Sequence, residues 1–260
     1  NPSYKIEKVR GLTNMMRVLN RPKTLPDPWI IWNDAKDIIK QIQRDQPDNP
    51  VYEYELALLF VHKLQPGRQP VPINRIRTRL EEAITICNNL YQRYRHVPEY
   101  TRVLAQALYN RAEFELRTNK MRIEPARLQM ATELLRESIY YQQRLTSEFP
   151  DLLQYQIRLN QSSHRLCEAY EKMGRLEDAQ EILELTIKEL DTFLDAHPQF
   201  EDARRILIED YHLLAILLDK NGQTRFAEAA REKEQKLREQ FQMDLERDPF
   251  DNHPLNNRPN

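Results

Sequence analysis

The segment LCEAYEKMGRLEDA, residues 166–179, joins two helical patterns through a single glycine. On both sides of it, apolar residues recur every three or four positions, which is the spacing of one face of an α-helix. Gly174 marks the end of the first helix, because glycine takes the positive φ of a helix C-terminus without strain. Pro198 ends the second helix, since the residue before a proline avoids helical backbone angles. The sequence therefore predicts a hairpin of two helices, over residues 151–173 and 176–196.

The same hairpin pattern returns along the whole chain with a period of 48 residues for its alanines. A proline stands near the start of each unit, and an alanine stands in each second helix. One helix pair cannot bury its apolar face alone, so repeats of this kind stack on their neighbours, and we expect the small alanines to let the helices approach closely. The alanines are Ala35, Ala83, Ala131, Ala179 and Ala227, and the prolines are Pro2, Pro50, Pro98, Pro150, Pro198 and Pro249.

These two sets of regularly spaced residues, which we call the alanine ladder and the proline ladder, divide the chain into units. We predict a single repeat domain over residues 1–248 and a polar C-terminal tail over residues 249–260. With only 4 glycines, the sequence has few of the positions that β-rich folds and phosphate-cradling loops require. The predicted repeats cover about residues 1–49, 50–97, 98–149, 150–197 and 198–248.

The segment 166–179 resembles a tetratricopeptide (TPR) repeat, a family that places a Leu, a small residue, a Tyr, a Gly and an Ala in this order. The fifth unit keeps the order with Leu in place of Tyr. Ordinary TPR units have a period of 34 residues, and two extra turns in each helix account for the excess here. The resemblance implies an all-α fold, a right-handed α-solenoid of about five long helical hairpins. The matching residues are Leu166, Cys167, Tyr170, Gly174 and Ala179, and then Leu214, Ala215, Leu218, Gly222 and Ala227.

The resemblance also implies a binding surface, because in the TPR family the first helix of each pair lines a concave face. In the first helix of the fourth unit, a polar stripe runs opposite the apolar one. We expect a protein or peptide partner to contact this stripe and the matching positions of the first and third units. A solvated face is the alternative interpretation of each single stripe. The candidate partner-binding residues are Arg10, Arg17, Tyr109, Glu113, Arg158, Gln161, Arg165, Glu168 and Lys172.

Long-helix arrays of this type resemble the TPR regions attached to bacterial serine/threonine kinases and related regulatory proteins. The resemblance implies a non-catalytic protein–protein interaction scaffold that forms the regulatory part of a larger bacterial signalling protein. A cytoplasmic location is favoured, and an extracytoplasmic one follows if a membrane segment precedes these residues. The alternative function is a structural or oligomerisation module whose long helices pair with copies of themselves.

The sequence contains no motif for catalysis or cofactor binding. A phosphate-binding loop, a dinucleotide-binding glycine pattern, a nucleophile elbow and a zinc-protease motif are all missing. We therefore expect no enzyme activity, no cofactor and no metal site. Cys87 and Cys167 each stand inside a helical pattern, which favours small buried apolar residues over a disulfide framework.

The charge of the chain is distributed unevenly. Residues 1–97 hold 16 Lys and Arg against 10 Asp and Glu, whereas residues 150–260 hold 15 against 23. This polarity favours oriented protein partners and does not favour nucleic acid. Arg75, Arg77 and Arg79 form a basic cluster that could bind phosphate, but no aromatic residue interleaves with it, so we favour a solvated cluster. No apolar run has the length of a membrane helix, so we expect no membrane insertion within this chain.

Overall fold

A computed structural model describes residues 4–11, 28–47, 49–61, 72–117 and 124–247 of the 260-residue chain. All regular secondary structure in these ranges is α-helical, as predicted from the sequence. The chain forms two compact units, Asn1–Leu145 and Thr146–Asn260, and each is described by itself. The division falls close to the predicted border between the third and fourth repeats, whereas the single domain predicted for residues 1–248 stays a prediction.

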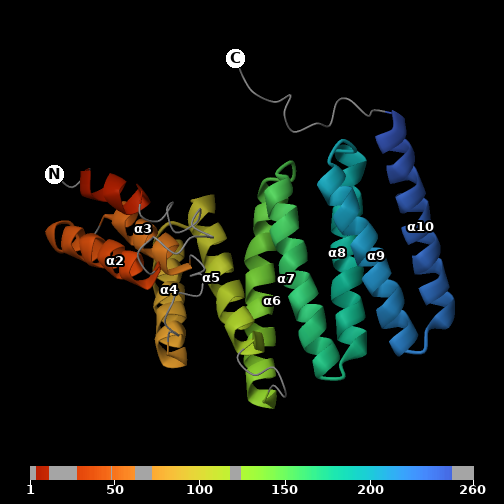
Figure 1. The fold of residues 1–260 in the computed structure, drawn as a ribbon, viewed down its shortest axis with the longest axis horizontal. Coiled ribbons are helices and arrows are strands. Elements are labelled where there is room, and N and C mark those ends of the chain that lie inside the picture. Colours follow the sequence, from red (N-terminus) through yellow and green to blue (C-terminus); the bar gives the residue numbers. More distant parts are fainter. Residues whose placement is uncertain (1–3, 12–27, 48, 62–71, 118–123, 248–260) are drawn as a thin grey trace. The chain divides into compact units, whose positions relative to one another are not determined.

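Unit 1 is built from long helices that mostly begin at a proline. Proline is well tolerated at the first helical position, because its missing N–H has no partner there in any helix. The helix α3 packs against α2, α4 and α5, so it lies at the centre of this unit. Residues 4–11 form a further helical segment before α2. The helices are α2 (Pro28–Asp45), α3 (Pro50–Val61), α4 (Ile73–Arg93), α5 (Pro98–Arg117) and α6 (Pro125–Glu148), whose last turn extends past the unit border (Figure 1).

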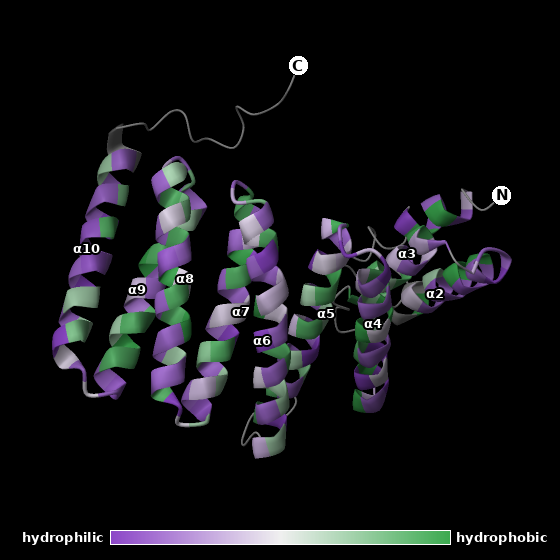
Figure 2. Ribbon diagram, turned by 180° about the vertical axis from the view of Figure 1, so that it is seen from behind, coloured by the Kyte–Doolittle hydropathy of each residue, from purple (hydrophilic) through white to green (hydrophobic). Residues whose placement is uncertain are grey.

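Unit 2 consists of two helical hairpins. Within it α7 packs on α8, α8 on α9, α9 on α10, and α7 also contacts α9. The C-terminal helix α10 buries mainly small residues such as Ala227 and Ala230 and is largely hydrophilic along its length (Figure 2). The helices are α7 (Leu153–Lys172), α8 (Leu176–Ala196), α9 (Glu201–Lys220) and α10 (Thr224–Arg247).

The turns of both hairpins in unit 2 have the predicted glycine geometry. Gly174 and Gly222 each have a φ of 73°. After α7, the Arg175 N–H donates to the Tyr170 carbonyl over 2.9 Å, and after α9 the Gln223 N–H donates to the Leu218 carbonyl over 2.9 Å. In each turn the N–H of one residue donates to the carbonyl five residues earlier, which is the hydrogen bond of a Schellman motif at a helix C-terminus.

The alanine ladder lies in the core, as predicted. None of the five alanines has exposed surface, and the Cys167 thiol of α7 donates to the Ala179 carbonyl of α8 over 3.2 Å. Both cysteines are buried and free, which confirms the prediction of small apolar residues. No helix in the described ranges is both long and apolar enough to cross a membrane. The buried alanines are Ala35, Ala83, Ala131, Ala179 and Ala227.

Candidate partner-binding surface

The predicted polar stripe of the fourth unit lies on one face of α7 in unit 2, and we call it the α7 stripe. Arg158, Gln161 and Lys172 are exposed, and Arg165 and Glu168 are half-buried. The Arg158 Nη1 donates to Gln161 Oε1 over 3.2 Å, and the Arg165 Nη1 lies 2.8 Å from Glu168 Oε2. These pairs, three residues apart on the helix, hold the long side chains along the surface.

A buried polar cluster lies beneath the α7 stripe and joins α7 to α9. Asp210 of α9 has no exposed surface, and its Oδ2 accepts a hydrogen bond from Asn160 Nδ2 over 2.6 Å. Its Oδ1 pairs with the His164 ring Nε2. The His164 side chain keeps 28% of its surface exposed, so the cluster reaches the surface between stripe residues. Because a buried carboxylate needs its partners, this cluster constrains how α7 packs against α9.

Sequence reasoning missed this cluster, although one signal for it exists. Asp210 occupies the same helix face as Leu207, Leu214 and Leu217, all of which are buried. A carboxylate at a core position of a helix must have partners on a neighbouring element. The identity of those partners depends on how the helices stack, which a helical pattern alone does not give.

A second contact between the same helices lies at the C-terminal end of α7. The Lys220 ammonium of α9 donates to Glu171 Oε1 over 3.1 Å. Unlike Asp210, both of these side chains are partly exposed. The contact is therefore a weak surface pair, whereas the buried cluster is the one that orients α7.

The other predicted partner-binding residues belong to unit 1. Arg10 donates from Nε to Glu55 Oε1 over 2.6 Å, and this hydrogen bond raises the pKa of Arg10. Tyr109 is half-buried on α5. Glu113 is only 5% exposed and lies 3.0 Å from Arg117, so most of its carboxylate faces the protein. Arg17 lies outside the described residues.

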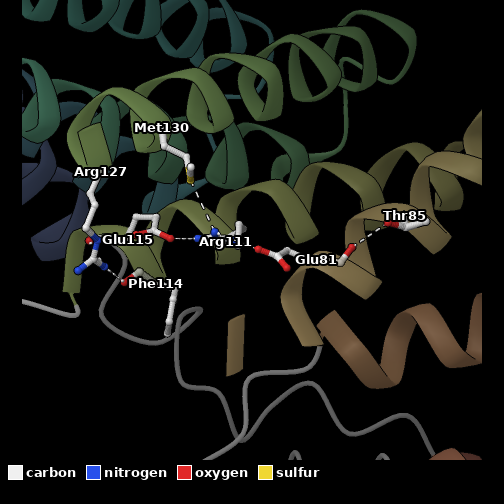
Figure 3. A network of polar contacts seen from close by, with 7 residues as sticks. All are labelled: Glu81, Thr85, Arg111, Phe114, Glu115, Arg127 and Met130. Carbon is white, nitrogen blue, oxygen red and sulfur yellow. Dashed lines mark hydrogen bonds and ion pairs between the residues drawn. The ribbon is translucent and has the colours of Figure 1, made fainter. Parts of the chain in front are cut away.

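Unit 1 also contains a buried ionic network between α4, α5 and α6, centred on Glu115 (Figure 3). The Glu115 carboxylate is 2% exposed. Its Oε1 accepts a hydrogen bond from Arg111, and its Oε2 accepts one from Arg127 over 2.6 Å. Arg111 also lies 3.4 Å from Glu81 of α4. Burial raises the pKa of Glu115, but the hydrogen bonds from both arginines outweigh it and leave this pKa lowered. The network holds three helices together rather than presenting a free charge.

Neither a reactive thiol nor a metal-binding cluster is found in the part of the chain that the structure describes. Burial raises the pKa of both Cys87 and Cys167 to about 12, so neither thiol ionises at neutral pH. No group of three or more His, Cys, Asp or Glu side chains in the described ranges is arranged to hold a metal ion.

Comparisons with known proteins agree with the geometry of stacked hairpins. No family model matches the chain, and no curated protein matches it in sequence. Among solved structures, BtubC (BKLC) from P. vanneervenii superposes with a TM-score of 0.54 at 14% identity, covering 98% of this chain and 84% of that chain. The chain has a TPR-like helical-repeat fold.

Two further solved structures are similar to the chain at lower TM-scores. A protein of Podosopora anserina with nearly identical TPR-like repeats gives a TM-score of 0.48 at 17% identity, covering 93% of this chain and 98% of that chain. MamA gives a TM-score of 0.42 at 14% identity, covering 82% of this chain and 91% of that chain. At these identities the likeness concerns the fold, and the function must be argued from the surface.

Proposed function

We propose that this TPR-like chain is a non-catalytic interaction scaffold that binds a protein or peptide through the α7 stripe. The single observation that supports it is the pairing of an exposed polar stripe with a buried anchor. Asp210 constrains how α7 packs against α9, and the Arg158–Gln161 and Arg165–Glu168 pairs order side chains on the exposed face of α7. A surface whose side chains are ordered beforehand loses less entropy on binding than a mobile one.

The chemistry of the α7 stripe indicates which groups a partner should offer. It carries three cations, Arg158, Arg165 and Lys172, against the single carboxylate of Glu168. Arginine forms paired hydrogen bonds with carboxylates, and Gln161 can accept or donate to a peptide backbone. We therefore expect a partner segment that presents Asp or Glu side chains.

In unit 1 the proposal extends to Arg10, Arg17, Tyr109 and Glu113. A partner would have to reach Glu113 through its ion pair with Arg117. The regulatory role in a larger bacterial signalling protein belongs to the same proposal. Its support is the sequence resemblance to the TPR regions attached to serine/threonine kinases.

A comparison of two charge-matched variants tests the α7 stripe. Arg158→Glu/Arg165→Glu reverses two stripe cations, and Lys188→Glu/Lys236→Glu makes the same change of charge at exposed sites of α8 and α10. Affinity capture with quantitative mass spectrometry is expected to show partners lost by the first variant and kept by the second. An unchanged set of partners, or equal loss in both variants, would reject the α7 stripe as the binding site.

Sedimentation velocity over a wide concentration range tests the alternative of self-association. A scaffold for other proteins is expected to keep one sedimentation coefficient as the concentration rises. A coefficient that increases with concentration, and that falls again in Arg158→Glu/Arg165→Glu, would favour pairing of the long helices with a second copy.

A further inference from the structure

A hollow in unit 1, remote in sequence from the α7 stripe, has three cations among the residues that line it. It has a volume of about 370 Å³ and lies between α2 and α4, against Phe60 of α3. Lys36 from α2 and Arg75 and Arg79 from α4 contribute its cations. Asn33, Asn74 and Thr78 add hydrogen-bonding side chains, and Glu82 is the single carboxylate in the lining.

Arg79 is the most constrained of the three cations. It is 6% exposed, and its guanidinium lies 5.3 Å from the centre of the Trp32 ring. Arg79 Nη2 and Trp32 Nε1 both donate to the Leu59 carbonyl of α3, over 3.4 and 3.2 Å. The sequence-based interpretation of a solvated cluster holds for Arg75 and Arg77, which are exposed. It is wrong for Arg79, which is buried beside an aromatic ring from another helix.

A second cation reaches the same indole ring. The Lys36 ammonium lies 4.8 Å from the centre of the Trp32 ring. The ring therefore attracts two positive charges that would otherwise repel each other. Contact with the Trp32 ring orients the Lys36 and Arg79 side chains before any ligand binds. Part of their side-chain entropy has then already been lost on folding.

The three cations in the lining of the hollow outnumber its single carboxylate, Glu82. Lys36 and Arg75 form no ion pair with any described residue, whereas Arg93 and Arg111 of the same unit do. The first turn of α4 contains no acidic side chain. Burial lowers the pKa of Arg79 to about 9, which still leaves the guanidinium charged at neutral pH. An anion in the hollow would offset this concentration of positive charge.

We propose that the hollow lined by Trp32, Lys36, Arg75 and Arg79 binds an oxyanion, either a carboxylate presented by an acidic protein segment or a phosphate. The guanidinium of Arg79 supplies the inner contact, and Lys36 and Arg75 enclose the anion from the two helices. Arginine suits planar carboxylates and phosphates because its N–H groups form a rigid fork. This site shares no residue with the α7 stripe, so an experiment can contradict this proposal without affecting the function proposed above.

The fluorescence of Trp32 reports on the site directly. The chain contains two tryptophans, so Trp29→Phe leaves Trp32 as the only indole. This protein is titrated with inorganic phosphate in one arm and with a glutamate-rich peptide in the other. Sodium chloride at equal ionic strength is the reference, because screening alone changes a charged surface. Calorimetric titration of the unaltered protein provides the same measurement if Trp29→Phe disturbs the fold.

Matched variants locate the binding. Lys36→Gln/Arg75→Gln removes two lining cations, and Arg44→Gln/Arg77→Gln removes one exposed cation from each of the same helices outside the lining. We expect saturable binding, with an affinity that Lys36→Gln/Arg75→Gln lowers by about tenfold or more. The reason is that each charge-assisted hydrogen bond contributes strongly to the binding free energy. The control pair is expected to change the affinity by less than about twofold.

The two arms separate the sources of the anion. Saturation with phosphate alone supports a site for a small anion, and saturation with the peptide alone supports a site for acidic side chains of a partner. The proposal is overturned if neither arm saturates beyond the chloride reference, or if both variant pairs weaken binding equally.

Discussion

Asn160 of α7 donates a hydrogen bond to Asp210 of α9 over 2.6 Å, and the accepting carboxylate is completely buried. We predict that Asp210→Ala destabilises unit 2 by about 3 kcal/mol, because removal of one member of a buried charged network leaves the others without a partner. Asp202→Ala, at an exposed position of the same helix, is expected to change stability by less than about 0.5 kcal/mol. Chemical denaturation of the three proteins measures both values.

A double-mutant cycle with Asn160→Ala separates the hydrogen bond from general packing. If the two residues interact as the structure shows, the double variant is destabilised by clearly less than the two single variants together. Additive effects would contradict the role given to Asp210 as the anchor of α7, and they would weaken the argument for an oriented α7 stripe.

The buried Glu115 of unit 1 gives a prediction about pH. We expect Glu115→Gln to cost about 3 kcal/mol at pH 7, because Arg111 and Arg127 then lose their buried counter-charge. The folded state lowers the pKa of Glu115, so the stabilisation is complete above the unfolded pKa of about 4.3 and is lost as the pH falls through the folded pKa. Denaturation curves of both proteins from neutral to acidic pH measure the difference.

The control for this prediction is Glu81→Gln, since Glu81 is mainly exposed and lies 3.4 Å from Arg111. Its cost is expected to stay below about 1 kcal/mol, as for other exposed pairs. A stability difference between wild type and Glu115→Gln that persists unchanged in acid would show that Glu115 acts through packing rather than charge.

The helical hairpins and their core were predictable from the sequence because both depend on local spacing. Ala179 was placed in the core by its position in the ladder, and Gly174 at the helix end by its backbone freedom. Contacts between charged residues were not predictable in this way. Asp210 lies 50 residues from Asn160, and the Trp32 that accompanies Arg79 belongs to a different repeat. The apolar pattern of a single helix indicates which of its faces is buried. It does not indicate which polar group of a neighbouring helix contacts that face.

Overpacking tests the close approach of α7 and α8 at Ala179. Ala179→Leu adds three carbon atoms at a position without exposed surface, next to the contact between the Cys167 thiol and the Ala179 carbonyl. We expect a loss of about 1–3 kcal/mol. Ala229→Leu makes the same change at an exposed position of α10 and is expected to be nearly neutral. Equal thermal melts for both variants would contradict the need for a small residue at Ala179.

The glycine turns of unit 2 allow a test of backbone strain without steric conflict. A Cβ at Gly174 or Gly222 would meet no atom within 4 Å, yet both residues have a φ of 73°. Gly174→Ala and Gly222→Ala are therefore each expected to cost about 1–2 kcal/mol, which is the penalty for an L-residue in the left-handed region. Gly11→Ala is the control, because Gly11 also has open space for a Cβ but lies in a helical segment without a positive φ, where alanine is the better helix former. Denaturation measurements in which Gly174→Ala and Gly11→Ala shift stability in the same direction would show that the turn after α7 does not require a left-handed residue.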